Sequence, residues 1–228
     1  MWYSVHLVSL LDALRDPPRP DPAGMPRNEY LRASPPMFGS PFVDRVTRVP
    51  VWVVPLIYVP AIALSFNAAA EALGWMTLVW LAGGYWVWTL TEYWLHRIVF
   101  HFEPEDGIGR RLHWIIHGVH HDHPNDPMRL VMPPAASIPL ALLFVALFHA
   151  LLPAAQAWGL LAGFLSGYLA YDMTHYYLHH RRPRGPVGRK LRELHMRHHF
   201  QDHTRGFGVS APWWDIVFGT PTRPGREP

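Results

Sequence analysis

Long stretches without a charged side chain most strongly limit how this 228-residue chain can fold. No Asp, Glu, Lys or Arg occurs over residues 49–70, 72–91 and 130–171, which are 22, 20 and 42 residues long. About 20 helical residues cross the roughly 30 Å hydrocarbon core of a bilayer. The longest stretch contains Pro153, which divides it in two. The sequence therefore predicts four transmembrane helices, over about 49–70, 73–95, 132–152 and 155–177.

The positive charges all fall on one side of these four predicted spans. Segments 1–48, 92–129 and 172–228 hold six, four and ten of the 20 Lys and Arg residues, and the two short turns hold none. The positive-inside rule places these segments and both termini in the cytoplasm. We expect an all-α integral membrane protein in which 1–48 form an interfacial helix (1–15) and a cytoplasmic arm. Residues 49–228 form the membrane domain, with a helical cytoplasmic cap.

Histidine is concentrated in this predicted cytoplasmic layer. Ten of the 16 histidines fall into four clusters, H-R-I-V-F-H, H-G-V-H-H, H-Y-Y-L-H and H-M-R-H-H. Imidazole is the commonest protein ligand for borderline transition metals, and helix residues three or four apart share a face. Protonated rings packed this closely would repel one another, whereas a metal binds the neutral form. Ten rings suit two ions, and the predicted ligands are His96, His101, His117, His120, His121, His175, His179, His195, His198 and His199.

The spacing of the histidines along the sequence indicates which of them can reach different ions and which are not ligands. His96 and His101 are five apart, about 140° around an α-helix, so we expect them to reach two different ions. The isolated His6 and His149 are interpreted as incidental side chains.

The available donors narrow the chemistry of this predicted centre. Cysteine is absent, so any metal site uses nitrogen and oxygen ligands. The H-E-x-x-H pattern of zinc proteases is missing, and His149 is the one isolated histidine inside a predicted span. An all-nitrogen pair of sites beside the acyl region favours two iron ions, with O₂ as co-substrate, attacking an unactivated C–H bond. Zinc binds such sites more tightly than iron and is expected to occupy them in a purified sample.

Longer motifs resemble one family. The chain is similar, from about residue 30 to 222, to the fatty acid hydroxylase and sterol desaturase superfamily, and within it to the fatty acid 2-hydroxylases that act on sphingolipid acyl chains. The motifs R-L-V-M-P-P and W-D-I-V-F-G-T belong to this branch. The matching segments are E-Y-W-L-H-R-I-V-F-H (92–101), L-H-W-I-I-H-G-V-H-H (112–121), R-L-V-M-P-P (129–134), Y-D-M-T-H-Y-Y-L-H-H (171–180), H-M-R-H-H (195–199), G-F-G-V (206–209) and W-D-I-V-F-G-T (214–220).

The resemblance implies a di-iron, O₂-dependent monooxygenase that inserts a hydroxyl group at C2 of a fatty acyl group, in a free fatty acid or a sphingolipid N-acyl chain. It also implies that the ten clustered histidines bind the metals, whereas His113, His123, His180 and His203 do not. A desaturase, a hydroxylase of another lipid such as a sterol or carotenoid, and a non-catalytic metal-binding membrane protein or transporter stay open as alternatives.

One difference from this family bears on the electron donor. Eukaryotic relatives carry an N-terminal cytochrome b5 domain marked by H-P-G-G, which residues 1–48 lack. We therefore expect a separate electron donor, either a cytochrome b5-like protein or a ferredoxin with its reductase, attracted by the basic cytoplasmic face. No basic stretch interleaved with aromatic residues favours nucleic acid. The excess of Arg over Lys, 19 to one, indicates a bacterial inner membrane, or the endoplasmic reticulum if the chain is eukaryotic.

Five further residues are candidates for roles around the metals. Asp172 and Asp202, each three residues from a clustered histidine, can accept a ligand N–H, although a helix cap or a headgroup-facing charge explains them equally well. Tyr171, Trp213 and Trp214 are candidates to line the substrate entrance, and anchoring at the membrane interface is the alternative.

Overall fold

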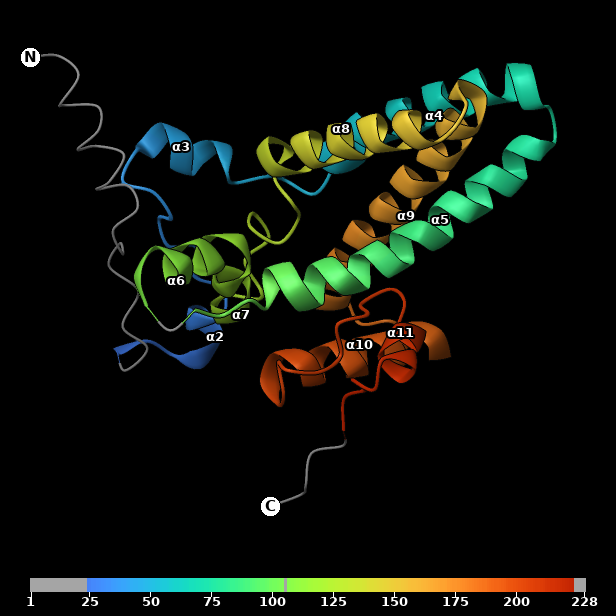
Figure 1. Ribbon diagram of the computed structural model, residues 1–228. Coiled ribbons are helices and arrows are strands. Elements are labelled where there is room, and N and C mark those ends of the chain that lie inside the picture. The colour runs from blue at the N-terminus through green and yellow to red at the C-terminus, as the bar shows by residue number, and fades with distance from the viewer. Residues whose placement is uncertain (1–23, 105, 224–228) are drawn as a thin grey trace, which may run out of the picture.

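The computed structural model describes residues 24–104 and 106–223, so the interfacial helix expected within residues 1–15 lies outside the described residues. The described part of the chain is helical and contains no strand. Figure 1 shows four long helices extending away from an end where the short helices gather. Their bounds agree within a few residues with the helices expected from the uncharged stretches. They are α4 (Val53–Leu73), α5 (Met76–Trp94), α8 (Pro134–Leu151) and α9 (Ala154–His180).

Helix α9 is the centre of this arrangement, and α4, α5 and α8 all pack against it. Helices α5 and α9 touch through their backbones. A Cβ atom on Gly84 would lie 1.9 Å from the carbonyl oxygen of Leu160, and one on Gly163 would lie 1.9 Å from that of Leu81. No side chain fits at these two positions, so the pair of glycines sets how closely the two helices approach.

Two of the four long helices have the length and composition of membrane spans. Among the described residues these are α4 and α8, with mean hydropathies of 1.8 and 2.0, and only 22% and 11% of their most apolar windows are buried by the rest of the chain. Leu64, Leu142 and Leu151 are among the large side chains left exposed. Such apolar surfaces fit lipid rather than water. Helices α5 and α9 are less apolar because they carry glycines, tyrosines and the acidic residues Glu92 and Asp172, so the four-span topology stays a prediction.

Short helices follow α5 and α9 at the same end of the molecule (Figure 1). The chain leaves α5 through a π-helix. After α9 it turns back under the bundle. In chain order these elements are η2 (Leu95–Phe100), α6 (Gly107–His113), a second π-helix η3 (Trp114–Gly118), α7 (Val119–Asp122), α10 (Pro186–Phe200) and α11 (Trp213–Val217).

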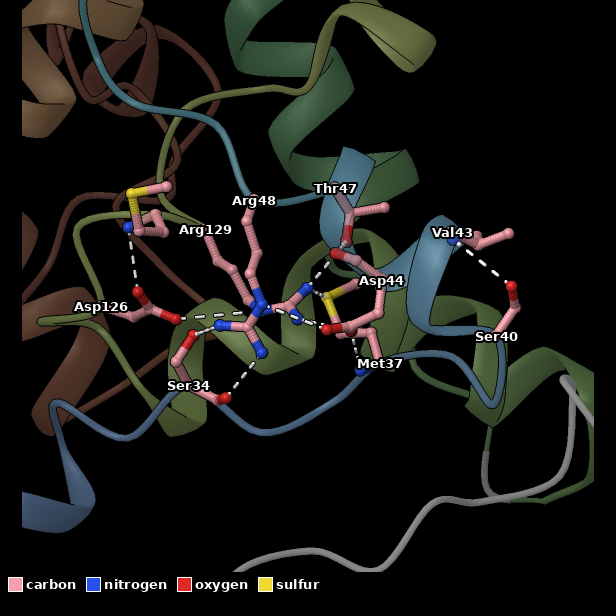
Figure 2. Close-up of polar contacts among 10 residues, drawn as sticks. Ser34, Met37, Ser40, Val43, Asp44, Thr47, Arg48, Asp126 and Arg129 are labelled. Atoms are coloured by element: carbon pink, nitrogen blue, oxygen red, sulfur yellow. Dashed lines mark hydrogen bonds and ion pairs between the residues drawn. The ribbon is translucent and has the colours of Figure 1, made fainter.

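The arm before α4 is fastened to the loop before α8. It contains α2 (Arg27–Tyr30) and α3 (Pro41–Val46). The Asp44 carboxylate on α3 accepts a hydrogen bond from Arg129 Nη2 at 2.6 Å and one from Arg48 Nε at 3.1 Å (Figure 2). The buried guanidinium of Arg129 is thus neutralised by a carboxylate from the arm. These contacts hold the R-L-V-M-P-P segment against the arm.

Candidate metal centre

All ten clustered histidines gather in two groups at the end of the bundle where the short helices lie. Within each group, the candidate ligand nitrogens all lie within 4.8 Å of one another. None of His113, His123, His180 and His203 falls in either group among the described residues. The first group is His96, His101, His117, His121 and His198, and the second group is His120, His175, His179, His195 and His199.

Each H-x-x-H-H motif contributes to both groups. Helix residues four apart share a face, whereas adjacent residues point about 100° apart. In the first motif, His117 and His121 belong to the first group and His120 to the second. The second motif, on α10, does the reverse, because its first and last histidines join the second group and His198 joins the first. The two motifs therefore place the two groups side by side.

His96 and His101 lie in the same group, whereas α-helical spacing predicted that they reach two different ions. The segment between them is the π-helix η2, in which the His101 N–H donates to the His96 carbonyl oxygen at 3.1 Å. This bond spans five residues, so it closes one turn and brings both side chains to one face. The prediction was wrong because it assumed the α-helical repeat.

Backbone carbonyl groups orient two rings of the first group. Nδ1 of His96 lies 2.7 Å from the carbonyl oxygen of Phe207, and Nδ1 of His198 lies 2.7 Å from that of Arg205. A carbonyl oxygen only accepts, so each Nδ1 carries the hydrogen and each Nε2 keeps its lone pair. The sequence analysis missed these partners because a carbonyl group leaves no mark in a side-chain pattern.

Glu103 supports the outer edge of the first group and was also missed. Its carboxylate lies 3.2 Å from Nδ1 of His101, 3.4 Å from Nε2 of His203 and 3.9 Å from Nε2 of His113. It thus orients the His101 ring in the way that carboxylates orient metal-binding histidines. An acidic residue two positions after a clustered histidine was the available signal.

Burial keeps the clustered rings neutral. Outside the four long helices, loss of solvent and neighbouring imidazoles lower the pKa of all eight clustered histidines, that of His101 to about 2 and that of His198 to about 4. The Nε2 atoms of His101 and His198 are 3.0 Å apart, and those of His179 and His195 are 2.8 Å apart. Neutral nitrogens about 3 Å apart suit neighbouring ligands held roughly 2.1 Å from one ion.

Several buried nitrogens have no hydrogen-bond partner among the residues that the structure describes. They include Nε2 of His120, Nε2 of His175 and both ring nitrogens of His199, all in the second group. Buried polar atoms are rarely left unpaired, and such atoms call for a bound water or ion. The donor set, the spacing and these unpaired atoms therefore fit one transition metal ion in each group.

The two acidic candidates have other partners. Asp172 is buried and accepts a hydrogen bond from the Tyr168 hydroxyl at 3.2 Å. Asp202 accepts from the backbone N–H and the hydroxyl of Thr204 at 3.1 and 2.5 Å. These described hydrogen bonds go to groups on the same helix or turn. A role for either carboxylate beside a metal stays a prediction.

Two other carboxylates hold the segment that follows α10 (residues 201–223), called the closing segment below. Asp215 on α11 accepts from the N–H groups of Phe207 and Gly208, both at 2.9 Å, and Glu92 accepts from the Ser210 N–H at 2.7 Å. Burial raises the pKa of Asp215, although these N–H groups oppose the effect. Asp215 therefore fixes the turn whose Phe207 carbonyl meets His96.

The aromatic candidates lie at different depths. Tyr171 is buried, and its ring stacks on His175 of the second group with centroids 5.8 Å apart. Trp213 and Trp214 pack on Trp86 of α5, with centroids 5.9 and 5.3 Å apart. Of these three, Tyr171 is thus the residue in contact with a clustered histidine. Substrate binding by all three stays a prediction.

Comparison with known proteins agrees with this geometry. The fatty acid hydroxylase family model matches residues 81–220. The chain is 39% identical over 188 residues to dihydroceramide fatty acyl 2-hydroxylase FAH2 of Arabidopsis thaliana, which covers 82% of this chain and 79% of that protein. It is 40% identical over 195 residues to ceramide very long chain fatty acid hydroxylase SCS7 of Saccharomyces cerevisiae, covering 84% of this chain and half of that protein.

A solved structure shows the same fold. It is described as full-length scs7p with only the hydroxylase domain visible, and it matches with a TM-score of 0.82 and 35% identity over 95% of this chain and 84% of that one. The chain belongs to the fatty acid hydroxylase family. The resemblance inferred from its histidine clusters and branch motifs is confirmed.

Proposed function

We propose that this protein is an O₂-dependent monooxygenase that inserts a hydroxyl group at C2 of a lipid acyl chain. Its relatives are fatty acid 2-hydroxylases and ceramide hydroxylases, which supports this reaction class. The observation that carries the proposal is the convergence of ten histidines, seven buried and three partly buried, into two groups of five. An all-nitrogen donor set of this kind suits a pair of iron ions.

The two groups divide the proposed metal binding between them. The first group would hold one ion and the second group the other. When bound, the iron pair would supply the O₂ chemistry that attacks the unactivated C–H bond. The protein holds the rings neutral and oriented, through the Phe207 and Arg205 carbonyls and the Glu103 carboxylate. Phe100, stacked on His117 at 5.1 Å, and Phe207 help to keep water from the first group.

An apolar groove offers space for an acyl chain. It has a volume of about 530 Å³ and lies between α4 and α8, with α9 behind it. The side chains that line it are mostly apolar, and Tyr58 and Ser65 contribute hydroxyl groups. A smaller cavity shares Tyr58 with this groove and continues along α9 to Tyr168. One turn further on, Tyr171 stacks on His175 of the second group. We assign this route to the acyl tail.

The proposed setting is a membrane with the two groups at its cytoplasmic face. Helices α4 and α8 support membrane association. Four spans would leave both termini and all ten clustered histidines on the basic side, where a separate electron donor has access.

Product analysis tests this function. The iron-loaded protein is supplied with a reductant, a matching donor protein, O₂ and lipids with one defined acyl chain. We expect a product that has gained one oxygen atom, at C2. Loss of two hydrogen atoms instead would identify a desaturase. Two tightly held zinc ions with no product under iron loading would favour a metal-binding protein without catalytic activity.

A further inference from the structure

A polar cavity of about 540 Å³ opens beside the second histidine group. Three arginines from three separate segments line it: Arg32 follows α2, Arg182 follows α9 and Arg192 lies on α10. His179 of the second group also lines the cavity. A concave site of this size suits a small-molecule group rather than a protein surface.

These three arginines have no acidic partner. Among the described residues, no carboxylate lies within ion-pair distance of Arg32, Arg182 or Arg192, although other arginines of the chain form ion pairs. The Arg192 Nε donates to the carbonyl oxygen of Leu178 at 3.0 Å, which fixes its guanidinium at the cavity. Unpaired cations converging on one cavity attract an anion.

One acidic group close to this cavity is already engaged. Asp126 acts electrostatically on His180, another lining residue. Its carboxylate accepts the Met128 N–H at 2.9 Å and lies 3.9 Å from Nε of the buried Arg129. Asp126 is 3% exposed and does not line the cavity, so it does not compensate the three arginines.

We propose that this cavity binds the anionic headgroup of the lipid substrate, a carboxylate or a phosphate, and so selects acidic acyl lipids over neutral ones. Guanidinium groups bind both anions through paired N–H donors. The inference rests on the proposed hydroxylation at C2. That carbon is bonded to the acyl carbonyl carbon, so a group attached there must lie within a few bonds of the metal. A cavity lined by His179 itself meets this requirement.

Lipid binding to the zinc-loaded protein tests the headgroup site without turnover. The ligands share one long acyl chain: the free fatty acid, its methyl ester, a neutral N-acyl sphingoid base and the same lipid carrying a phosphate. The variants are Arg32→Gln and Arg182→Gln, both at exposed positions whose side chains form no hydrogen bond or ion pair with the described residues. Arg184→Gln is the matched control, because it lies in the same loop as Arg182 and does not line the cavity.

We expect each cavity variant to bind the acidic lipid about tenfold more weakly. This loss corresponds to the lower end of the range of free energies for a hydrogen bond to a charged group. Binding of the methyl ester and the neutral sphingolipid stays unchanged, and the control behaves as wild type. Weakened binding of the fatty acid identifies a carboxylate, and weakened binding of only the phosphorylated lipid identifies a phosphate. The proposal is overturned if the wild type binds the free acid no better than the ester and the phosphorylated lipid no better than the neutral sphingolipid, with neither cavity variant changing any of these affinities.

Parallel turnover of the iron-loaded protein separates the two proposals. Selective binding of acidic lipids without any hydroxylated product would support the headgroup site and refute the proposed function. Efficient hydroxylation of the neutral sphingolipid, with no effect of Arg32→Gln or Arg182→Gln, would support the function and refute the headgroup site.

Discussion

The His96 imidazole donates its Nδ1 hydrogen to the carbonyl oxygen of Phe207, 111 residues away in the sequence and 2.7 Å away in space. That carbonyl belongs to a turn whose N–H groups are held by the buried carboxylate of Asp215. A side chain on α11 thus sets the orientation of a ring in the first histidine group. The closing segment after α10 is in this way part of the metal centre.

Replacement of Asp215 by Ala should therefore reduce metal binding without removing a ligand. We expect lower metal content in the first group and a loss of about 2 kcal/mol in the free energy of unfolding, because buried N–H groups lose their acceptor. Elemental analysis and thermal unfolding in detergent measure the two effects. Asp106→Ala, at an exposed position, is the control. Wild-type metal content in Asp215→Ala would show that this turn does not orient His96.

Single ligand replacements should remove one ion each. We expect His120→Ala to lose a metal ion from the second group and His198→Ala to lose one from the first, because each removes a ring that faces the other members. Activity should fall by more than the roughly 10–100-fold that is typical when a supporting residue is lost. His149→Ala is the control, since His149 donates to Val145 on α8 and belongs to neither group. Full activity in either cluster variant contradicts the assignment.

The positions of the long helices follow from the sequence because they depend on local hydropathy. The three uncharged stretches make up most of α4, α5, α8 and α9, and α9 continues through polar residues to His180. The gathering of the histidines was also predictable, since one metal site draws ligands from several segments.

The backbone partners of the rings were not predictable from sequence, whereas Glu103 lies only two positions after His101. The π-turn between His96 and His101 changes which residues share a face, and no residue type signals it. The Arg205 and Phe207 carbonyls act through backbone geometry, after a chain reversal that follows α10. Asp172 and Asp202 lie close to a clustered histidine in the sequence. The carbonyl groups that orient His96 and His198 instead reach these rings through the folding of the chain after α10.

The Asp44 carboxylate, which joins the arm before α4 to the loop before α8, should make the stability of the fold depend on pH. Burial alone raises the pKa of Asp44, but hydrogen bonds from the Met37 N–H and from Arg129 outweigh it and hold the pKa below its usual value. The ionised form therefore stabilises the fold above the unfolded pKa of about 3.9, and this contribution is lost as the pH falls through the lower folded value.

Asp44→Asn should remove this pH dependence and lower stability at neutral pH by about 3 kcal/mol, because Arg129 keeps its buried charge without its main partner. Chemical unfolding in detergent from about pH 7 down to about pH 2, an interval that extends well below the unfolded pKa of about 3.9, measures both effects. Glu71→Gln, an exposed change in the last turn of α4, should leave the curve unchanged. An Asp44→Asn curve that parallels the wild type would refute the assignment.

The backbone contact between α5 and α9 gives a test with a neighbouring control. Gly84→Ala places a methyl group against the Leu160 carbonyl, so the helices must separate, at a cost of about 1–3 kcal/mol. Gly83→Ala meets only the Leu160 Cδ1 atom at 3.7 Å and should be neutral or stabilising. Thermal unfolding compares the two. Equal stability of both variants would show that the helices are not in backbone contact.

The acyl route along α9 predicts a change in chain-length preference. Ala141 on α8 lines both the apolar groove and the smaller cavity, so Ala141→Phe should obstruct the passage between them. We expect turnover of long acyl chains to fall about tenfold, the effect of roughly 1.4 kcal/mol, while short chains that end before Ala141 are hydroxylated at the wild-type rate. Ala146→Phe, exposed on the same helix and outside both cavities, is the matched control. Product profiles over a series of chain lengths provide the measurement. A uniform loss for all lengths would indicate damage to folding rather than a blocked route, and an unchanged profile would place the acyl tail elsewhere.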